Sequence, residues 1–271
     1  MELRDRVVVV TGGARGIGFA LARAFLAEGA HTVVVADLEE SAVASAASEL
    51  GPNAHGIHVD VADADALARL VAEVEDAHGP IDLFVSNAGI GTGAGLDADA
   101  ATWDRIWRVN VLAHVHAARA VLPSMLARGE GYLLSTASAA GLLTQIGDLP
   151  YSVTKHAAVS VAEWLAVSYG DQGIKVSCLC PQGVRTDMIA TDGLSSVETV
   201  VAQGVIEPEE VAAAVVQGLR DERFLILPHP EVATYYQRRA TDPDRWLAGM
   251  RRLQARILGT LGDTPVDRPG P

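Results

Sequence analysis

The stretch Val7-Val8-Val9-Val10-Thr11-Gly12-Gly13-Ala14-Arg15-Gly16-Ile17-Gly18 decides the fold of this chain. It begins with an apolar run typical of a buried strand and continues with a glycine-rich turn. The amphipathic segment from Ile17 to Glu28 then predicts a helix that ends at Gly29. Glycines permit a tight turn, and the start of a helix offers free N–H groups to an anion. The stretch therefore predicts a phosphate-binding turn. Its Gly-x-x-x-Gly-x-Gly spacing differs from the commoner Gly-x-Gly-x-x-Gly of dinucleotide-binding turns, although the glycines would serve the same purpose.

Strand and helix patterns alternate along the rest of the chain. Further strands are expected at 33–37, 57–61, 81–86, 132–136, 174–180 and 224–227. Helices are expected at 39–50, 64–78, within 102–128, at 151–172 and at 208–220. Strands that alternate with helices indicate an α/β protein of the doubly wound Rossmann class, with a seven-stranded parallel sheet and helices on both faces.

We predict one domain over residues 1–261, because no linker or change of composition divides the chain. Its core would span residues 5–228, with a substrate lid at about 187–207, a C-terminal helical extension at 231–261 and a disordered tail at 262–271. The extension carries the pairs Arg238-Arg239 and Arg251-Arg252. These pairs suggest an anion patch or, in the interpretation that we favour, a solvated helix face.

The composition argues against several classes of partner. A net charge of −13 disfavours binding to nucleic acid or to an anionic membrane. The apolar runs are short and the start of the chain has no apolar signal region, so we expect a cytoplasmic protein without a membrane span. Cys178 and Cys180 alternate on a predicted strand and are expected to be small buried thiols. The histidines are scattered, and we expect no metal site.

Asp37 ends the second predicted strand, where a carboxylate accepts hydrogen bonds from an adenosine ribose. A 2′-phosphate would meet like charge there, and residues 38–46 contain no Arg or Lys to neutralise it. We therefore expect NAD rather than NADP. Two alternatives stay open: Arg15 could serve a 2′-phosphate from the glycine-rich turn, and the position of Asp37 also suits a helix N-cap.

Tyr151 and Lys155 stand four residues apart at the start of a predicted helix, so they share a face. A phenol loses its proton near pH 10, and acid–base work at neutral pH needs a shift of roughly 2 to 3 units, or about 3 to 4 kcal/mol. One ammonium about 4 Å away in a partly desolvated site contributes on the order of 4 kcal/mol. The pair is a candidate acid–base couple, although the same spacing also arises by chance on amphipathic helices.

In this order of motifs the chain resembles the short, single-domain branch of the short-chain dehydrogenase/reductase family. The resemblance covers about residues 5–228 and rests on Thr11 to Gly18, Asp60-Val61, Asn87-Ala88-Gly89 and the spacing of Asn110, Ser138, Tyr151 and Lys155. It implies that the last four residues form a catalytic tetrad. Tyr151 would exchange the proton with the substrate oxygen, and Ser138 would hydrogen-bond that oxygen. Lys155 would lower the pKa of Tyr151 and bind the nicotinamide ribose, and Asn110 would hold a water that links Lys155 to solvent.

The resemblance also implies the binding surfaces. The cofactor would contact Gly12, Arg15, Gly16, Ile17, Gly18, Asp37, Leu38, Asp60, Val61, Asn87, Ala88, Gly89, Tyr151, Lys155, Pro181, Val184 and Thr186. The substrate pocket would include Ser138, Ala140, Gln145, Asp148, Gln182 and Met188. One departure is that Gln182 stands where the family usually has a glycine after Pro181. We expect the Gln182 side chain to reach the substrate pocket, the alternative being that Gly183 merely takes over the turn.

These features predict an NAD-dependent oxidoreductase that interconverts a secondary alcohol and a ketone by hydride transfer. The expected substrate is a medium-sized hydrophobic ketone or secondary alcohol. The resemblance implies a homotetramer or homodimer built through the helix within 102–128 and the helix that carries Tyr151. Two alternatives are an imine or activated C=C reductase on the same scaffold and a non-catalytic protein that senses NADH.

Overall fold

The computed structural model describes residues 1–188 and 204–260. Most of the predicted lid at 187–207 and all of the predicted tail at 262–271 lie outside the described residues. Within the described part of the chain, no helix combines the length and the apolar character needed to cross a membrane.

The centre of the molecule is a parallel sheet of seven strands in the order β3-β2-β1-β4-β5-β6-β9. The strands are β1 (Val7–Thr11), β2 (Thr32–Asp37), β3 (Ala54–His58), β4 (Leu83–Ser86), β5 (Gly131–Thr136), β6 (Ile174–Leu179) and β9 (Leu225–Ile226). This arrangement confirms the predicted doubly wound fold. The strand order reverses between β1 and β4, and ligands of such sheets bind at that point, outside the carboxyl ends of the strands.

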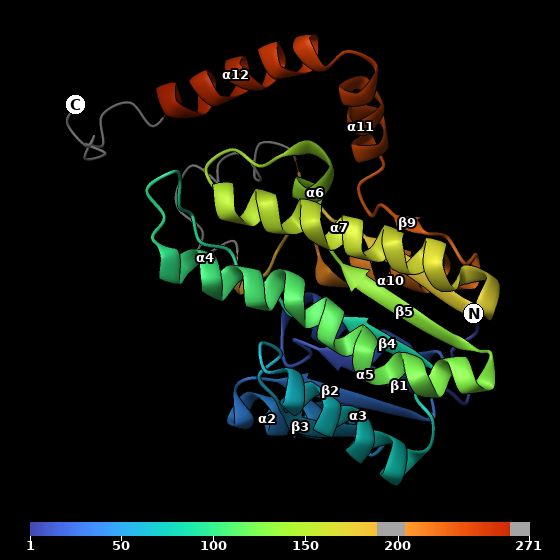
Figure 1. The fold of residues 1–271 in the computed structure, drawn as a ribbon. Coiled ribbons are helices and arrows are strands. Elements are labelled where there is room, and N and C mark those ends of the chain that lie inside the picture. The colour runs from blue at the N-terminus through green and yellow to red at the C-terminus, as the bar shows by residue number, and fades with distance from the viewer. Residues whose placement is uncertain (189–203, 261–271) are drawn as a thin grey trace.

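Helices cover both faces of the sheet (Figure 1). They are α1 (Gly16–Ala27), α2 (Glu40–Leu50), α3 (Ala64–His78), α4 (Ala100–Trp107), the π-helix η1 (Arg108–Leu112), α5 (Ala113–Arg128), α6 (Ala140–Leu143), α7 (Leu149–Tyr169), the 3₁₀-helix η2 (Gly170–Gln172), α10 (Pro208–Arg220), α11 (Glu231–Thr241) and α12 (Pro243–Thr260). Helices α3, α5 and α7 bury side chains in one hydrophobic core, while α1 and α10 bury theirs in the other.

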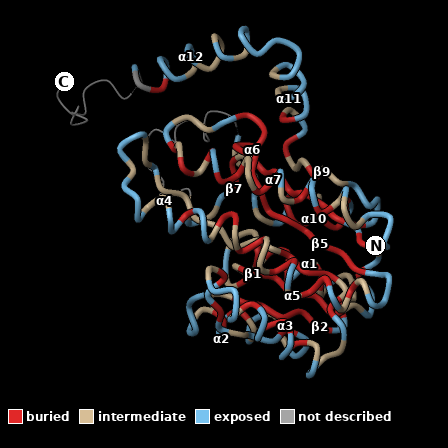
Figure 2. The backbone as a smooth tube through the Cα atoms, viewed as in Figure 1, coloured by how far each residue is buried: buried red, intermediate tan, exposed pale blue. Residues whose placement is uncertain are grey.

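The side chains of β1 alternate between these two cores. Val7 and Val9 belong to the core under α3, α5 and α7, and Val8 and Val10 belong to the opposite core. A strand that is buried on both faces has no polar alternation, which explains its continuous apolar run. Figure 2 shows the buried strands at the centre and the exposed backbone of α12 at the periphery.

The third strand differs from the prediction. It was expected at 57–61, but β3 comprises Ala54–His58. Its register with β2 ends where Asp37 pairs with His58, and Val59 then donates a hydrogen bond to the Asp37 carbonyl as the chain turns away. Val59 and Val61 are buried as the chain leaves the sheet, whereas His55 and His58 are exposed on the edge strand. The apolar run therefore marked burial rather than strand pairing.

The C-terminal extension is two helices rather than one continuous segment. Helix α11 ends at Thr241, the chain bends at Asp242, and α12 then runs above α6 (Figure 1). Strand β7 (Gly183–Val184) also pairs in parallel with β8 (Val205–Ile206), which anchors the far end of the predicted lid segment.

Candidate active site

The glycine-rich turn joins β1 to α1 at the point where the strand order reverses. The first turn of α1 contains no acidic residue, and Arg15 at the N-cap makes no side-chain capping bond. The N–H groups that open the helix therefore remain available to an anion. A Cβ on Gly18 would lie 2.1 Å from the Gly12 carbonyl oxygen, so the close approach of these two segments requires glycine. Such a turn fits the pyrophosphate of a nicotinamide dinucleotide.

The turn after β4 is fastened to this first turn. The Asn87 side chain donates hydrogen bonds of 3.1 Å to the carbonyls of Thr11 and Gly12. The Thr11 hydroxyl accepts from the backbone N–H groups of Asn87 and Ala88. On the other side, a Cβ on Gly16 would lie 3.1 Å from Cγ2 of Thr186. The structure therefore brings together three segments that the sequence assigned to the cofactor.

Asp37 sits beside the same turn. Its carboxylate accepts hydrogen bonds from the backbone N–H groups of Ala14, at 3.1 Å, and Leu38, at 2.8 Å. Asp37 is not the N-cap of α2, because Glu39 holds that position. After β3, the exposed carboxylate of Asp60 accepts from the backbone N–H of Ala62. Asp37 thus lies at the end of β2 beside the glycine-rich turn, the position from which the sequence predicts a contact with the adenosine ribose.

Lys155 is buried beneath Tyr151 on α7. Its ammonium lies 5.6 Å from the centroid of the Tyr151 ring and donates a 3.0 Å hydrogen bond to the Thr136 carbonyl at the end of β5. Burial lowers the pKa of Lys155 to about 8, while the nearby thiols Cys180 and Cys178 oppose the shift. Both cysteines are buried and free, as predicted. The group is still largely protonated at pH 7 and presents a cation to the Tyr151 side.

Asn110 lies in the π-helical turn η1, a type of irregularity that is frequent at functional sites. Its Oδ1 accepts from the Ile90 N–H at 2.9 Å, and its Nδ2 donates to the Ile90 carbonyl at 2.9 Å and to the Thr154 hydroxyl at 3.2 Å. A Cβ on Gly89 would come within 3.2 Å of Lys155 Nζ and 3.4 Å of Asn110 Oδ1. The turn after β4 therefore runs directly beside the Lys155 ammonium.

Ser138 follows β5 and faces the segment after β6. Its hydroxyl oxygen accepts a hydrogen bond from the Ala140 N–H at 3.1 Å and lies 3.4 Å from the Pro181 carbonyl. The next turn is braced by His229, which the sequence did not single out. His229 Nδ1 accepts from the Gln182 N–H at 3.2 Å, and its Nε2 lies 3.1 Å from the Gly183 carbonyl. Burial lowers the pKa of His229, which favours the neutral ring that this pair of bonds needs.

Asp148 has a role that differs from the predicted pocket contact. It is buried at 2% exposure and caps α7 by accepting from the Tyr151 N–H at 2.9 Å. The same carboxylate accepts from the N–H and hydroxyl of Thr92 and from the Gly93 N–H, each at 2.7 Å. Four protein donors thus hold Asp148, and it ties the 92–93 loop to the start of the helix that carries Tyr151.

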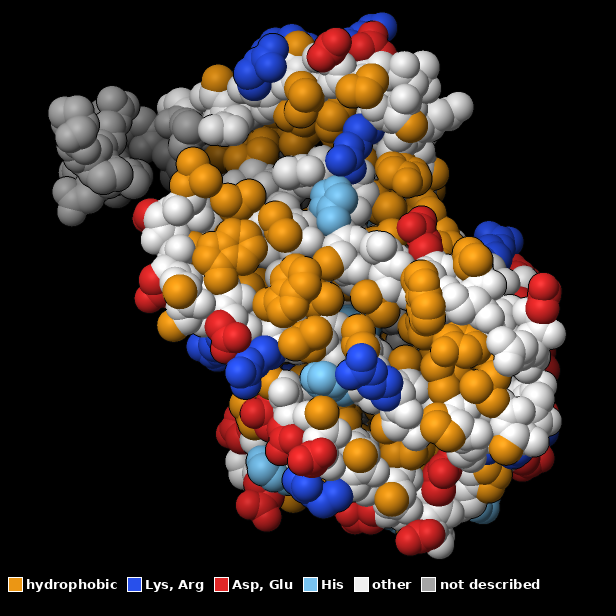
Figure 3. All heavy atoms as spheres, viewed as in Figure 1, with side chains coloured by type: hydrophobic (Ala, Val, Ile, Leu, Met, Phe, Trp, Pro, Cys, Tyr) orange, Lys and Arg blue, Asp and Glu red, His pale blue; other side chains and the backbone are white. Residues whose placement is uncertain are grey.

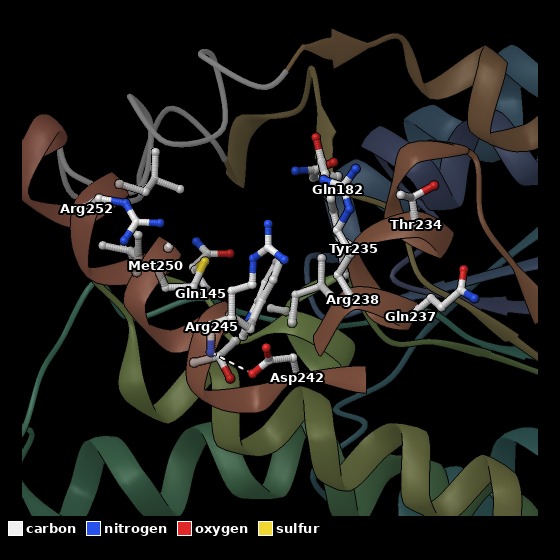
Figure 4. A pocket seen from close by; sticks show the side chains of 18 of the residues that line it. Gln145, Gln182, Thr234, Tyr235, Gln237, Arg238, Asp242, Arg245, Met250 and Arg252 are labelled. Carbon is white, nitrogen blue, oxygen red and sulfur yellow. Dashed lines mark hydrogen bonds between the residues drawn. The ribbon is translucent and has the colours of Figure 1, made fainter. Parts of the chain in front are cut away.

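A cavity of about 870 Å³ opens beside Ser138 (Figure 4). It is walled on one side by α6 and the Gln182 turn and on the other by α11 and α12. Of the residues predicted for the pocket, Ser138, Ala140, Gln145 and Gln182 line it, whereas Asp148 and Met188 do not. The lining also contains residues of the two C-terminal helices that the sequence did not single out for the pocket, among them Tyr235, Trp246 and several arginines.

These features together fit a nucleotide-binding site at the carboxyl ends of the strands. The family model described as short chain dehydrogenase matches residues 6–194. The chain is 38% identical over 199 residues to the sex determination protein tasselseed-2 of Zea mays, a match that covers 69% of this chain and 58% of that protein. It is 35% identical over 221 residues to meso-2,3-butanediol dehydrogenase of Serratia marcescens, covering 79% of this chain and 86% of the relative.

The solved structures agree. A short-chain dehydrogenase/reductase from Burkholderia phymatum in complex with NAD aligns with a TM-score of 0.83 and 27% identity, covering 100% of this chain and 99% of that chain. The chain therefore belongs to the short-chain dehydrogenase/reductase family, which confirms the resemblance found in the sequence. It is an oxidoreductase of the kind that uses a nicotinamide cofactor.

Proposed function

We propose that this protein is an NAD-dependent oxidoreductase that interconverts a secondary alcohol and a ketone. The observation that carries the proposal is that the buried Lys155 ammonium lies 5.6 Å from the Tyr151 ring centroid and is bonded to the end of β5, while Ser138, two residues further along the chain, lines the 870 Å³ cavity. The butanediol dehydrogenase relative, whose name gives a secondary alcohol as substrate, supports this reaction class. A bound nicotinamide would supply or accept hydride at the substrate carbon.

The side chains of this protein would transfer the proton to and from the substrate oxygen. In the direction of reduction, the Tyr151 hydroxyl donates its proton to the carbonyl oxygen as the carbon is reduced, and in oxidation the phenolate takes the proton of the alcohol. Ser138 donates a second hydrogen bond to the same oxygen and fixes its position. The Lys155 ammonium, 5.6 Å from the Tyr151 ring centroid, stabilises the phenolate by its charge. Thr136 and the β5 strand hold that ammonium in place.

The preference for NAD rests on Asp37. Its carboxylate is fixed at the rim of the turn by Ala14 and Leu38, so a 2′-phosphate there would meet a negative charge that cannot move away. Arg15 is exposed nearby and is the residue that would favour NADP. We expect Asp37→Ser to raise kcat/KM with NADPH relative to NADH by about 10-fold or more. An unchanged ratio would show that Asp37 does not select the cofactor.

The decisive test is a spectrophotometric assay of NADH and NADPH oxidation with a panel of ketones, and of the reverse reaction with alcohols. Tyr151→Phe should lower kcat by about 100- to 10,000-fold. Its NADH affinity, measured by fluorescence titration, should stay near that of the wild type. Tyr236→Phe is the matched control, because Tyr236 lies on α11, is 40% exposed and is not a member of the predicted tetrad. A Tyr151→Phe enzyme with wild-type kcat, or a wild type that reduces imines or C=C bonds but no ketone, would overturn the proposal.

We also propose that the chain forms a homo-oligomer, a tetramer or a dimer, through α4 and α7. Trp107, Val153, Trp164 and Val167 are large hydrophobic residues on these helices with 40%, 40%, 61% and 87% of their surface exposed. Figure 3 shows hydrophobic side chains gathered over this region. Such a face is typical of an interface between copies. Light scattering should give a multiple of 28.4 kDa for the wild type and 28.4 kDa for a Trp164→Glu, Val167→Glu double variant; a monomeric wild type would contradict the proposal.

A further inference from the structure

The two C-terminal helices carry a charge opposite to that of the rest of the chain. The whole protein has a net charge of −13. Its residues 231–260 nevertheless contain six arginines, at 238, 239, 245, 251, 252 and 256, against the acidic residues Glu231, Asp242 and Asp244. A cationic segment on an acidic protein changes the local potential for any anion that approaches it.

Most of these arginines surround the cavity beside Ser138. Arg238 lines it from α11, and Arg245, Arg252 and Arg256 line it from α12. The three positions on α12 are seven and four residues apart and therefore lie on one helix face. Arg251 falls on another face and does not line the cavity. Figure 4 shows Arg238, Arg245 and Arg252 around the same space as Gln145 and Gln182.

Within the described part of the chain, no acidic side chain pairs with the three arginines at 238, 245 and 252. Among residues 1–188 and 204–260, Arg238, Arg245 and Arg252 form no ion pair within 4.0 Å, in contrast to the pairs Arg108 with Asp104 and Arg185 with Glu207 elsewhere on the molecule. Asp242 is the acidic residue in the lining, and its Oδ1 accepts the backbone N–H of Arg245 at 3.0 Å at the start of α12. The cavity therefore has an excess of positive charge on its α12 side.

The lining of the cavity combines apolar, polar and cationic side chains. Trp246, Met250 and Leu253 alternate with the arginines on α12 and supply apolar surface. Ser138 and Gln182 lie on the opposite wall, where the reaction would occur. A ligand that satisfied all of these groups would have a polar reacting end, an apolar body and an anionic end.

We propose that the substrate is a ketone or secondary alcohol that carries an anionic acid group, joined to the reacting carbon through an apolar body. Its carbonyl would lie at Ser138, and its anionic group would bind Arg245 and Arg252, assisted by Arg238. This inference rests on the proposed ketone reduction for the position of the reacting end. It replaces the sequence expectation of a plainly hydrophobic substrate, and it assigns to the arginines a role other than a solvated helix face.

The test compares 4-(4-acetylphenyl)butanoate with its methyl ester, which share a ketone and an apolar body and differ in charge. We expect kcat/KM for the acid to exceed that for the ester by about 10-fold, mainly through KM, and to fall as NaCl is added. Arg252→Ala should lower kcat/KM for the acid by about 10-fold and change kcat/KM for the ester by less than about 2-fold. Arg251→Ala is the matched control, one residue away and outside the cavity, and should leave both substrates unchanged.

Binding provides a readout that does not depend on turnover. Trp246 lines the cavity, so quenching of tryptophan fluorescence reports occupancy by the same acid and ester. Binding of the acid that Arg252→Ala weakens and Arg251→Ala does not would support the anion site even if neither ketone were reduced, an outcome that would count against ketone reduction alone. Equal use and equal binding of acid and ester, or equal effects of the two arginine variants, would overturn the anion site while leaving ketone reduction in place.

Discussion

Removal of the Asp148 carboxylate should destabilise the protein far more than the loss of an ordinary helix cap. The carboxylate is 2% exposed and accepts hydrogen bonds from Thr92 N–H, Thr92 Oγ1, Gly93 N–H and Tyr151 N–H at 2.7 to 2.9 Å. An N-cap alone contributes about 1 kcal/mol, and a hydrogen bond to a charged group contributes roughly 1.5 to 3 kcal/mol. Since such bonds are not additive, we expect Asp148→Ala to lower the free energy of unfolding by about 4 kcal/mol.

Asp148→Ser separates the contribution of the helix cap from that of the hydrogen bonds to the 92–93 loop. Serine restores the cap on α7 but cannot reach the 92–93 loop with two oxygens, so a loss of about 2 to 3 kcal/mol is expected. The control is Asp63→Ala, because Asp63 caps α3 with bonds to Asp65 and Ala66 but is exposed; it should lose about 1 kcal/mol. Urea unfolding at one fixed protein concentration measures all three variants. Equal losses for Asp148→Ala and Asp63→Ala would refute the idea that Asp148 fastens the loop.

Two further predictions concern buried titratable groups. Folding lowers the pKa of Lys155 from 10.5 to about 8, so the unfolded chain binds the proton more tightly and the charge of Lys155 destabilises the wild type by about 3 kcal/mol below pH 8. This cost disappears as the pH rises towards 10.5. The stability of Lys155→Met relative to wild type should therefore be higher by about 3 kcal/mol below pH 8 than near pH 10.5. Urea unfolding at pH 7, 8, 9 and 10 checks this, and a pH-independent difference would contradict it. His114 is buried, has no hydrogen-bond partner among the described residues, and burial lowers its pKa to about 3; we therefore expect His114→Leu to raise the unfolding free energy by about 1 to 3 kcal/mol, while a loss of stability would show that the imidazole has a partner.

The framework of the fold was readable because its signals are local. The valines of β1 are buried on both faces of the sheet, and the turn that follows needs glycine at position 18, where a Cβ would meet the Gly12 carbonyl of the same turn. Boundaries at the sheet edge were less readable, since Val59 and Val61 are buried without pairing in β3. Periodicity reports burial, and at an edge strand burial and pairing end at different residues.

The details of the site depend on contacts that no local pattern encodes. Asp148 was predicted as a polar point in the pocket, but its partners Thr92 and Gly93 lie more than fifty residues away, and their hydrogen bonds exist only in the folded chain. The π-helical setting of Asn110 likewise has no turn residue or proline to announce it. Arg252 and Arg251 are equivalent in sequence, and only the placement of α12 above α6 decides which of them faces the cavity.

The position of α12 separates the residues proposed for cofactor binding and proton transfer from those proposed for substrate binding. The turn that would hold the cofactor and the Tyr151–Lys155 pair come from the carboxyl ends of the sheet strands and the helices that follow them, so the fold itself fixes their geometry. The opposite wall of the cavity comes from α11 and α12, which follow the last strand and dock through Arg239, whose guanidinium contacts the Leu142 carbonyl and lies 3.1 Å from His156 Nε2. Because α12 supplies none of the strand-end residues, changes on its cavity face should alter KM for the substrate while leaving cofactor affinity intact. If the proposed function holds, substrate selection is expected to depend on this appended surface, which is separate from the strand-end residues proposed for proton transfer.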